Sequence, residues 1–221
     1  MRLRRLVVLL AAALLPVPAE AQQTGPAAVH IDFEGAAPST LPAGFEPGLT
    51  GKGGPVKWLV NEDPSAPAGP NVLAETSGDR TDYRFPLAIL NGFQAKDVEV
   101  AVRFKPISGK VDQAAGLMVR VRDPNNYYIA RANALENNVR LYKVVDGRRQ
   151  QFAGVNVPVV NGRWQQLILR VEGDHFVVGL DGKTLFEARD DTFKEAGRVG
   201  LWTKADSLTH FDDFTVRRLP D

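Results

Sequence analysis

Hydrophobic and polar residues alternate along most of the second half of the chain. In the segment 98–105, Val98, Val100, Val102 and Phe104 are separated by mostly polar residues, and this period of two predicts a strand with one buried face. Asp146-Gly147 and Asp181-Gly182 are dipeptides that favour tight hairpins. Further strands are predicted in the segments 117–122, 127–133, 138–145, 148–155, 164–171, 176–180, 184–188, 198–203 and 208–217.

The first half of the chain shows a weaker pattern. From Gln22 to about Pro70 it is rich in Pro, Gly and Ala around two apolar islands, Val29 to Phe33 and Val56 to Val60, which predict strands separated by long surface loops. The segment 190–196 could form one helical turn, and no long helical period lies outside the N-terminal run. Short strands without βαβ alternation predict one all-β domain over 29–218, an antiparallel sandwich of two sheets.

The N-terminus has the pattern of an export signal. Three arginines within the first five residues precede an unbroken apolar run from Leu6 to Leu15, and Ala19 and Ala21 supply small residues before Gln22. The run is too short to span a bilayer. We predict a signal peptide over 1–21, a flexible segment over 22–28, and a periplasmic or secreted protein with no membrane span after cleavage.

Composition excludes several classes of protein. The chain has 221 residues, 44% of them hydrophobic, which is enough for one well-cored domain. It has no cysteine, so disulfide scaffolds, thiol enzymes and thiolate metal sites are excluded. After cleavage behind Ala21 the mature chain carries 24 basic and 25 acidic residues, and this balance argues against nucleic acid as a partner.

Five segments resemble a known superfamily. They are 115–120 (AGLMVR), 126–131 (NYYIAR), 138–142 (NVRLY), 197–206 (GRVGLWTKAD) and 211–216 (FDDFTV). Together they resemble secreted bacterial domains of the concanavalin A-like lectin/glucanase superfamily, in particular LamG-like domains and the 3-keto-disaccharide hydrolase group. The resemblance implies a jelly-roll sandwich in which the first and last strands pair and a concave sheet face or its rim handles a sugar.

The resemblance leaves the activity open, because one fold can carry many functions. Classical retaining glucanases of this fold carry an E-x-D-x-x-E strand, which this chain lacks. Its nearest acidic cluster, Glu187, Asp190, Asp191 and Glu195, has a different spacing and reads as solvated surface. The first hypothesis is therefore a carbohydrate-binding domain. The alternatives are a 3-keto-glycoside hydrolase or lyase, whose catalytic base the sequence does not assign, and a structural or protein-interaction domain.

Planar polar and aromatic side chains on the predicted strands are the candidate sugar contacts, because sugar C–H faces stack on rings and sugar hydroxyls suit hydrogen bonds with Arg, Asn and Asp. Arg120 and Arg140 are expected to face away from the core as a pair, whereas Trp58 and Trp164 are expected inside it. The alternative is that the aromatic residues pack in the core and the arginines are only solvated. The candidates are Arg120, Tyr128, Arg131, Asn133, Arg140, Tyr142, Trp202 and Lys204.

Acidic residues on the first and last strands suggest one further site. Asp32 lies on the first strand beside His30 and Glu34, and Asp213 lies on the last strand beside His210 and Asp212. If these strands pair, Asp32 and Asp213 could contribute oxygen ligands to a structural Ca²⁺. The alternative is a polar strand pair that faces solvent. The histidine spacing does not match a zinc motif.

Overall fold

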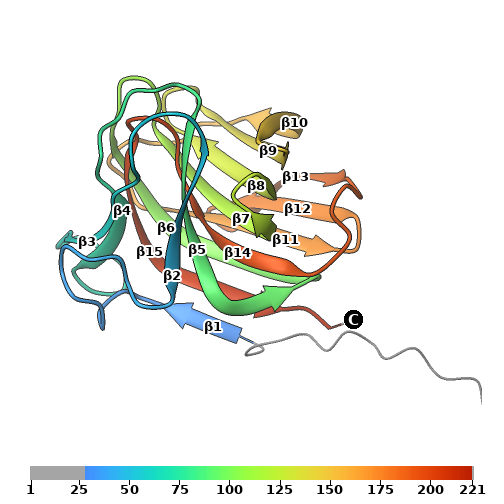
Figure 1. Ribbon diagram of the computed structural model, residues 1–221, viewed down its shortest axis with the longest axis horizontal. Helices are drawn as coiled ribbons and strands as arrows, with labels where there is room; N and C mark the ends of the chain where they lie inside the picture. Colours follow the sequence, from blue (N-terminus) through green and yellow to red (C-terminus); the bar gives the residue numbers. More distant parts are fainter. Residues whose placement is uncertain (1–27, 221) are drawn as a thin grey trace, which may run out of the picture.

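The computed structural model describes residues 28–220, which form fifteen strands and no helix (Figure 1). Two antiparallel sheets stack face to face. Sheet A has the strand order β13-β12-β11-β6-β15-β4-β3, with β1 added on β15, and sheet B has the order β10-β9-β8-β7-β14-β5-β2. The strands are β1 (Ala28–Ile31), β2 (Phe45–Gly51), β3 (Trp58–Glu62), β4 (Asn71–Glu75), β5 (Arg84–Ala95), β6 (Val98–Ser108), β7 (Ala114–Asp123), β8 (Asn126–Asn133), β9 (Asn138–Val145), β10 (Arg148–Asn156), β11 (Gln165–Glu172), β12 (His175–Leu180), β13 (Lys183–Arg189), β14 (Gly197–Trp202) and β15 (Leu208–Arg218).

This architecture confirms the predicted all-β jelly roll. The ten strands β6 to β15 lie where the alternating pattern predicts them, and β1 pairs with β15, so the first and last strands are neighbours. The predicted helical turn at 190–196 is wrong, because that segment is an irregular connection. The first half also contains three strands that the sequence pattern did not predict: β2, within the segment predicted as loops, and β4 and β5, which lie beyond that segment.

The main core lies between the two sheets. Val100, Val102 and Phe104 of sheet A are fully buried against residues of sheet B such as Leu117 and Leu201. Alternate positions on each strand contribute to this layer, as expected for two stacked sheets. The burial of these side chains accounts for the period of two in the sequence.

A second apolar cluster covers the other face of sheet B. Phe85, Ile89, Met118, Ile129 and Trp202 are buried there, away from the main core. Sheet B therefore has two buried faces, and its outer face is not an open apolar surface. The whole cluster consists of Phe85, Leu87, Ile89, Ala114, Met118, Val121, Tyr127, Ile129, Tyr142, Val144 and Trp202.

Contacts between distant strands of sheet B close this outer face. Thr50, on the edge strand β2, donates a hydrogen bond to the Pro124 carbonyl at the β7–β8 turn and also contacts the Tyr127 hydroxyl at 2.9 Å. Tyr83, just before β5, donates to the Gly147 carbonyl in the β9–β10 turn. The strand β2 and the residue before β5 are thus linked to the β7–β8 and β9–β10 turns across the outer face of sheet B.

No helix of residues 28–220 has the length and apolar character needed to cross a membrane. The predicted signal peptide lies outside the described residues.

Candidate functional site

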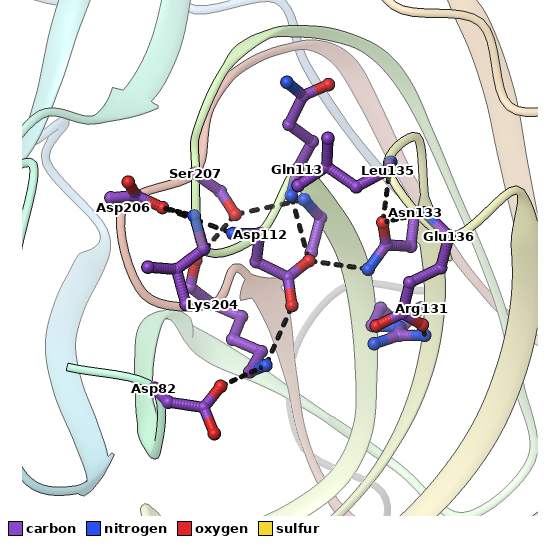
Figure 2. A network of polar contacts seen from close by, with 12 residues as sticks. Asp82, Asp112, Gln113, Arg131, Asn133, Leu135, Glu136, Lys204, Asp206 and Ser207 are labelled. Atoms are coloured by element: carbon purple, nitrogen blue, oxygen red, sulfur yellow. Dashed lines mark hydrogen bonds and ion pairs between the residues drawn. The ribbon is translucent and has the colours of Figure 1, made fainter. Parts of the chain in front are cut away.

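Six charged side chains from six different segments meet at the edge of the second apolar cluster. Three are acidic and three are basic, and we call them the polar cluster. Four connections or turns and two strands supply them, so residues up to 122 positions apart come together; Figure 2 shows most of them. The polar cluster consists of Asp82, Asp112, Arg131, Glu136, Arg149 and Lys204.

Lys204 links two acidic residues of the polar cluster. Its Nζ lies 2.6 Å from Asp82 Oδ1 and 2.9 Å from Asp112 Oδ2 (Figure 2). Burial of the ammonium disfavours its charge, but the two carboxylates outweigh this effect and raise the pKa of Lys204. Lys204 is therefore a fixed cation that bridges the β4–β5 and β6–β7 connections.

Asp112 is almost fully buried and organises the neighbouring turn. Its Oδ1 accepts a hydrogen bond of 2.6 Å from Asn133 Nδ2. Asn133 Oδ1 in turn accepts from the backbone N–H groups of Leu135 and Glu136 at 2.9 and 3.0 Å. These hydrogen bonds fix the β8–β9 turn. Asn137 in this turn has a positive φ of 49°, a conformation that asparagine tolerates. The turn places Glu136 over Arg131.

Arg131 is the buried arginine of the polar cluster. Its Nη2 donates to Glu136 Oε2 at 2.7 Å and to Asn138 Oδ1 at 2.8 Å, while its buried Nε has no partner. Burial works against the charge of Glu136, yet the hydrogen bond from Asn138 and the Arg131 charge outweigh it and lower the pKa of this carboxyl. Glu136 is therefore an anion at neutral pH.

The polar cluster opens to solvent through two of its acidic side chains. The Asp82 side chain is 77% exposed and that of Glu136 is 49% exposed. Their partners Lys204 and Arg131 lie beneath them. A ligand that reached this rim would meet carboxylate acceptors and, behind them, cationic donors, a combination suited to sugar hydroxyls.

Three aromatic rings lie next to the polar cluster. Phe85 stacks on Trp202 with ring centroids 5.2 Å apart, and the Arg131 guanidinium lies 5.5 Å from the Tyr142 ring. The Arg149 guanidinium covers all three rings, at 4.6 Å from Phe85, 4.5 Å from Tyr142 and 5.8 Å from Trp202. The rings are thus next to charged groups but beneath Arg149.

Glycines make room for this arrangement. Trp202, Gly116, Arg131, Arg140 and Gly154 lie opposite one another across β14, β7, β8, β9 and β10. A Cβ at Gly116 would come within 3.1 Å of Trp202 Cβ, and one at Gly154 within 2.4 Å of Arg140 Cδ. The absence of these two side chains lets the neighbouring large side chains lie along the sheet.

Five of the eight predicted sugar contacts lie at or beside the polar cluster: Arg131, Asn133, Tyr142, Trp202 and Lys204. Arg140 lies opposite Arg131 and donates to Asn156 Oδ1, so it is a neighbour of this group. These assignments as sugar contacts stay predictions.

Tyr128 and Arg120 lie elsewhere. The Tyr128 ring packs in the main core, and its hydroxyl donates to Asp190 at 2.6 Å. The expectation that Arg120 faces away from the core beside Arg140 is wrong. Arg120 lies at a bulge of β7 with φ of 50° and is 1% exposed. It donates to the carbonyls of Lys96, Gly173 and Phe193, so it ties three connections together.

Trp164 also differs from expectation. The predicted core position is correct for Trp58, which is 2% exposed. Trp164 is only partly buried; its Nε1 donates to Ser65 Oγ at 3.1 Å, and Lys105 lies over its ring at 5.3 Å.

Sequence reasoning missed four members of the polar cluster, Asp82, Asp112, Glu136 and Arg149. The first three belong to connections, where no periodicity assigns a direction. Arg149 follows the Asp146-Gly147 hairpin, and the alternation along β10 could have placed it on the same face as Tyr142.

The predicted calcium ligands Asp32 and Asp213 have other partners. His30 Nε2 lies 2.6 Å from Asp213 Oδ1, and Asp32 Oδ1 accepts from the Glu34 backbone N–H at 3.1 Å. Within residues 28–220, no group of three or more acidic or histidine side chains is arranged to hold a metal ion. Calcium binding remains an untested prediction.

Comparison with known proteins supports the fold. The carbohydrate binding module CBM66 from Bacillus subtilis matches with a TM-score of 0.59 and 23% identity over 72% of this chain and 91% of the module. Domain 4 of AbnA, an extracellular GH43 arabinanase from Geobacillus stearothermophilus solved with arabinotriose, matches with a TM-score of 0.56 and 14% identity over 89% and 94%. At these identities the likeness shows the fold.

One curated sequence is also similar. The levanase of Bacillus subtilis (strain 168) is 32% identical to the chain over 89 residues, which are 40% of this chain and 13% of the levanase. The similarity thus spans a small part of that protein. No family profile matches the chain.

Proposed function

We propose that this protein is an exported carbohydrate-binding domain and that its sugar site is the polar cluster at the edge of the second apolar cluster. The observation that carries the proposal is the convergence of three carboxylates and three cations beside three aromatic rings. Sugars combine hydroxyl groups, which pair with such charged groups, with apolar C–H faces, which pack on rings.

The charge balance favours a neutral sugar. Two of the three cations of the polar cluster already face a carboxylate, in the pairs Lys204–Asp82 and Arg131–Glu136. A hydroxyl can donate to the carboxylate and accept from the cation of the same pair, whereas an anionic group would displace the carboxylate. The site therefore suits neighbouring hydroxyls of an uncharged sugar ring.

The shape of sheet B favours the end or a branch of a polysaccharide. The second apolar cluster fills the outer face of the sheet, and the contacts of Thr50 with Pro124 and of Tyr83 with Gly147 close it. A long chain has no open path along this face. One or two sugar units can reach Asp82 and Glu136 at its rim.

The protonation of Glu136 and the pairing of Asp112 support binding rather than hydrolysis. A glycosidase needs a carboxylic acid with a raised pKa that donates a proton to the leaving group. Here the ion pair and hydrogen bonds lower the pKa of Glu136, and Asp112 is paired with Lys204. Both groups suit a fixed hydrogen-bond acceptor.

The similar proteins suggest which sugars to test. One is named for levan, and another was solved with arabinotriose. We therefore propose a neutral polysaccharide such as a fructan or an arabinan as ligand. Together with the N-terminal export pattern, this ligand class supports the proposal that the domain works in the periplasm or the medium.

Calorimetric titration of the mature chain with levan and arabinan oligosaccharides tests the proposal. We expect binding to at least one of them, with affinity lowered at least tenfold by Glu136→Gln. Arg163→Gln is the matched control, because Arg163 forms an exposed ion pair with Asp181 far from the polar cluster. Equal affinity of wild type and Glu136→Gln would contradict the site. Cleavage of a 3-keto-disaccharide by the same preparation would instead establish the enzymatic alternative.

A further inference from the structure

Arg149 is held in an unusual way for an arginine on an edge strand. It lies on β10, the outermost strand of sheet B, yet its guanidinium extends inward over Phe85, Tyr142 and Trp202 at centroid distances of 4.6, 4.5 and 5.8 Å. These rings are 0%, 7% and 0% exposed. The guanidinium therefore covers an aromatic surface that borders the polar cluster.

The Arg149 guanidinium contacts aromatic rings and lacks the hydrogen bonds that fix the other buried arginines. Arg84 and Arg120, two fully buried arginines near connections, donate to several carbonyl or carboxylate oxygens. In contrast, Nη1 of Arg149 is buried with no hydrogen-bond partner. A buried donor without an acceptor is destabilising. The contacts that hold the guanidinium in place are therefore those with the three rings, and no hydrogen bond within residues 28–220 adds to them.

Charge opposes this position as well. Burial disfavours the charged form of Arg149, and the nearby Arg131 repels it; both effects lower the pKa of Arg149. A side chain that is held by cation–π attraction and is desolvated and repelled at the same point can be displaced at small cost.

The place that the guanidinium occupies fits a sugar ring. Carbon atoms in contact lie about 3.5–4.0 Å apart, so a pyranose or furanose ring stacked on Tyr142 or Phe85 would fill the same space. From there its hydroxyls would face Arg131 and Glu136, since Arg131 lies 5.5 Å from the same Tyr142 ring.

We propose that Arg149 is a displaceable cover of the sugar site: its guanidinium occupies the aromatic surface formed by Phe85, Tyr142 and Trp202, and a bound sugar takes its place while Arg149 moves to solvent. This inference rests on the proposed function. In this proposal Arg149 competes with the sugar and lowers the affinity. A shorter side chain at position 149 is therefore predicted to strengthen binding.

Two readouts test the cover independently, one with ligand and one without. All variants carry Trp164→Phe, so that the buried Trp58 and Trp202 are the remaining indoles. Acrylamide quenching of indole fluorescence reports whether the ring surface is uncovered, and titration with the levan or arabinan oligosaccharide reports affinity. Arg148→Ala, an exposed arginine of the same strand, is the matched control.

We expect Arg149→Ala to raise the quenching constant at least twofold without ligand and to tighten sugar binding about tenfold, which corresponds to about 1.4 kcal/mol. Arg149→Met keeps an apolar cover and should bind like the parent. Arg148→Ala should change neither readout.

Three results would overturn the inference. Weaker binding by Arg149→Ala would make Arg149 a direct sugar contact, while the proposed function would stand. Unchanged quenching in Arg149→Ala would show that other groups cover Trp202. Absence of sugar binding in every variant, with quenching raised in Arg149→Ala, would instead contradict the proposed function and with it the displacement by sugar.

Discussion

A buried ion pair between Arg84 and Glu75 should be the main support of the connections around the polar cluster. The two side chains are 0% and 1% exposed, with Nη2 to Oε1 at 3.1 Å and Nη1 to Oε2 at 3.4 Å. The same guanidinium donates to the carbonyls of Gly54, Pro55 and Ala205 at 3.3, 3.0 and 3.3 Å. Arg84 thus joins β4 and β5 to two connections, and Ala205 directly follows Lys204.

Replacing Arg84 by Met would leave the Glu75 carboxylate buried without its cation. Removing one partner of a buried pair costs about 3–5 kcal/mol. Glu75 would still accept from the Lys57 backbone N–H at 2.9 Å and from Ser77 Oγ at 3.0 Å, which offsets part of the loss, but three carbonyls would lose a donor. We expect Arg84→Met to lower the free energy of unfolding by about 3–4 kcal/mol.

Urea unfolding at pH 7 measures this loss, and a double-mutant cycle assigns it to the pair. The double variant Glu75→Leu/Arg84→Met leaves no fully buried unpaired charge, because Asp79, the other carboxylate near Arg84, is 24% exposed. It should therefore be less destabilised than Arg84→Met alone. Arg80→Met is the control, because Arg80 is 64% exposed and lies 3.6 Å from Asp206; it should cost under about 1 kcal/mol. A loss below about 1 kcal/mol in Arg84→Met, or additive effects in the cycle, would refute the reasoning.

Two further predictions concern acid stability and packing. Hydrogen bonds from Lys143, Thr192 and Tyr128 outweigh the effect of burial and lower the pKa of Asp190 from 3.8 to about 2. Because the folded pKa is the lower one, this stabilisation is present above pH 4 and is lost as pH falls towards 2. Asp190→Asn should therefore be less stable by about 1–2 kcal/mol at pH 7, after allowance for solvent screening, and should lose less between pH 4 and 2 in urea titrations. Gly116→Ala should cost about 1–3 kcal/mol in the same assay, because its Cβ would lie 2.8 Å from Ile129 Cδ1.

Each of these has a result that would contradict it. If the free energies of unfolding of wild type and Asp190→Asn fell in parallel from pH 4 to 2, the Asp190 carboxylate would have the same pKa in the folded and the unfolded state. For packing, Gly35→Ala is the control, since a Cβ there has no neighbour within 4 Å. Equal stability of the two glycine variants would show that the outer face of sheet B yields easily at Gly116.

The alternation of hydrophobic and polar residues predicted strands well where one face of the strand is buried, and poorly where both faces of the strand are buried. Strands such as β6 and β11 bury alternate residues, and their pattern is clear in the sequence. The first seven residues of β5, Arg84 to Leu90, are all buried, because one side packs in the main core and the other in the second apolar cluster. A continuous apolar run carries no period of two, so this strand was missed.

The candidate site was predictable in part for the same reason. Arg131, Tyr142 and Trp202 lie on regular strands, so a search for planar and aromatic side chains found them. That Arg131 lies opposite Arg140 follows from the register between β8 and β9. The sequence pattern of a single strand does not determine this register.

The error at Arg120 has a local cause. Alternation would carry it to the face opposite its neighbours, but the bulge between Val119 and Asp123 changes the direction of its side chain. Gly197 allows this close approach, since a Cβ there would lie 2.5 Å from the Arg120 carbonyl carbon. A glycine on the neighbouring strand was the one sign of this geometry in the sequence.

The indole N–H resonances test the central claim most directly, because the three tryptophans report on three different places. Trp58 lies in the main core, and Trp164 lies just before β11 with Lys105 over its ring. Trp202 lies beside the polar cluster, with its Nε1 3.2 Å from the Tyr127 hydroxyl. In a ¹H–¹⁵N titration of the mature chain with the levan or arabinan oligosaccharide, we predict a saturable shift of the Trp202 indole and of the Arg131 side-chain N–H, with Trp58 and Trp164 unchanged. A shift confined to Trp164, or no shift of any indole at saturating sugar, would contradict a sugar site at the polar cluster.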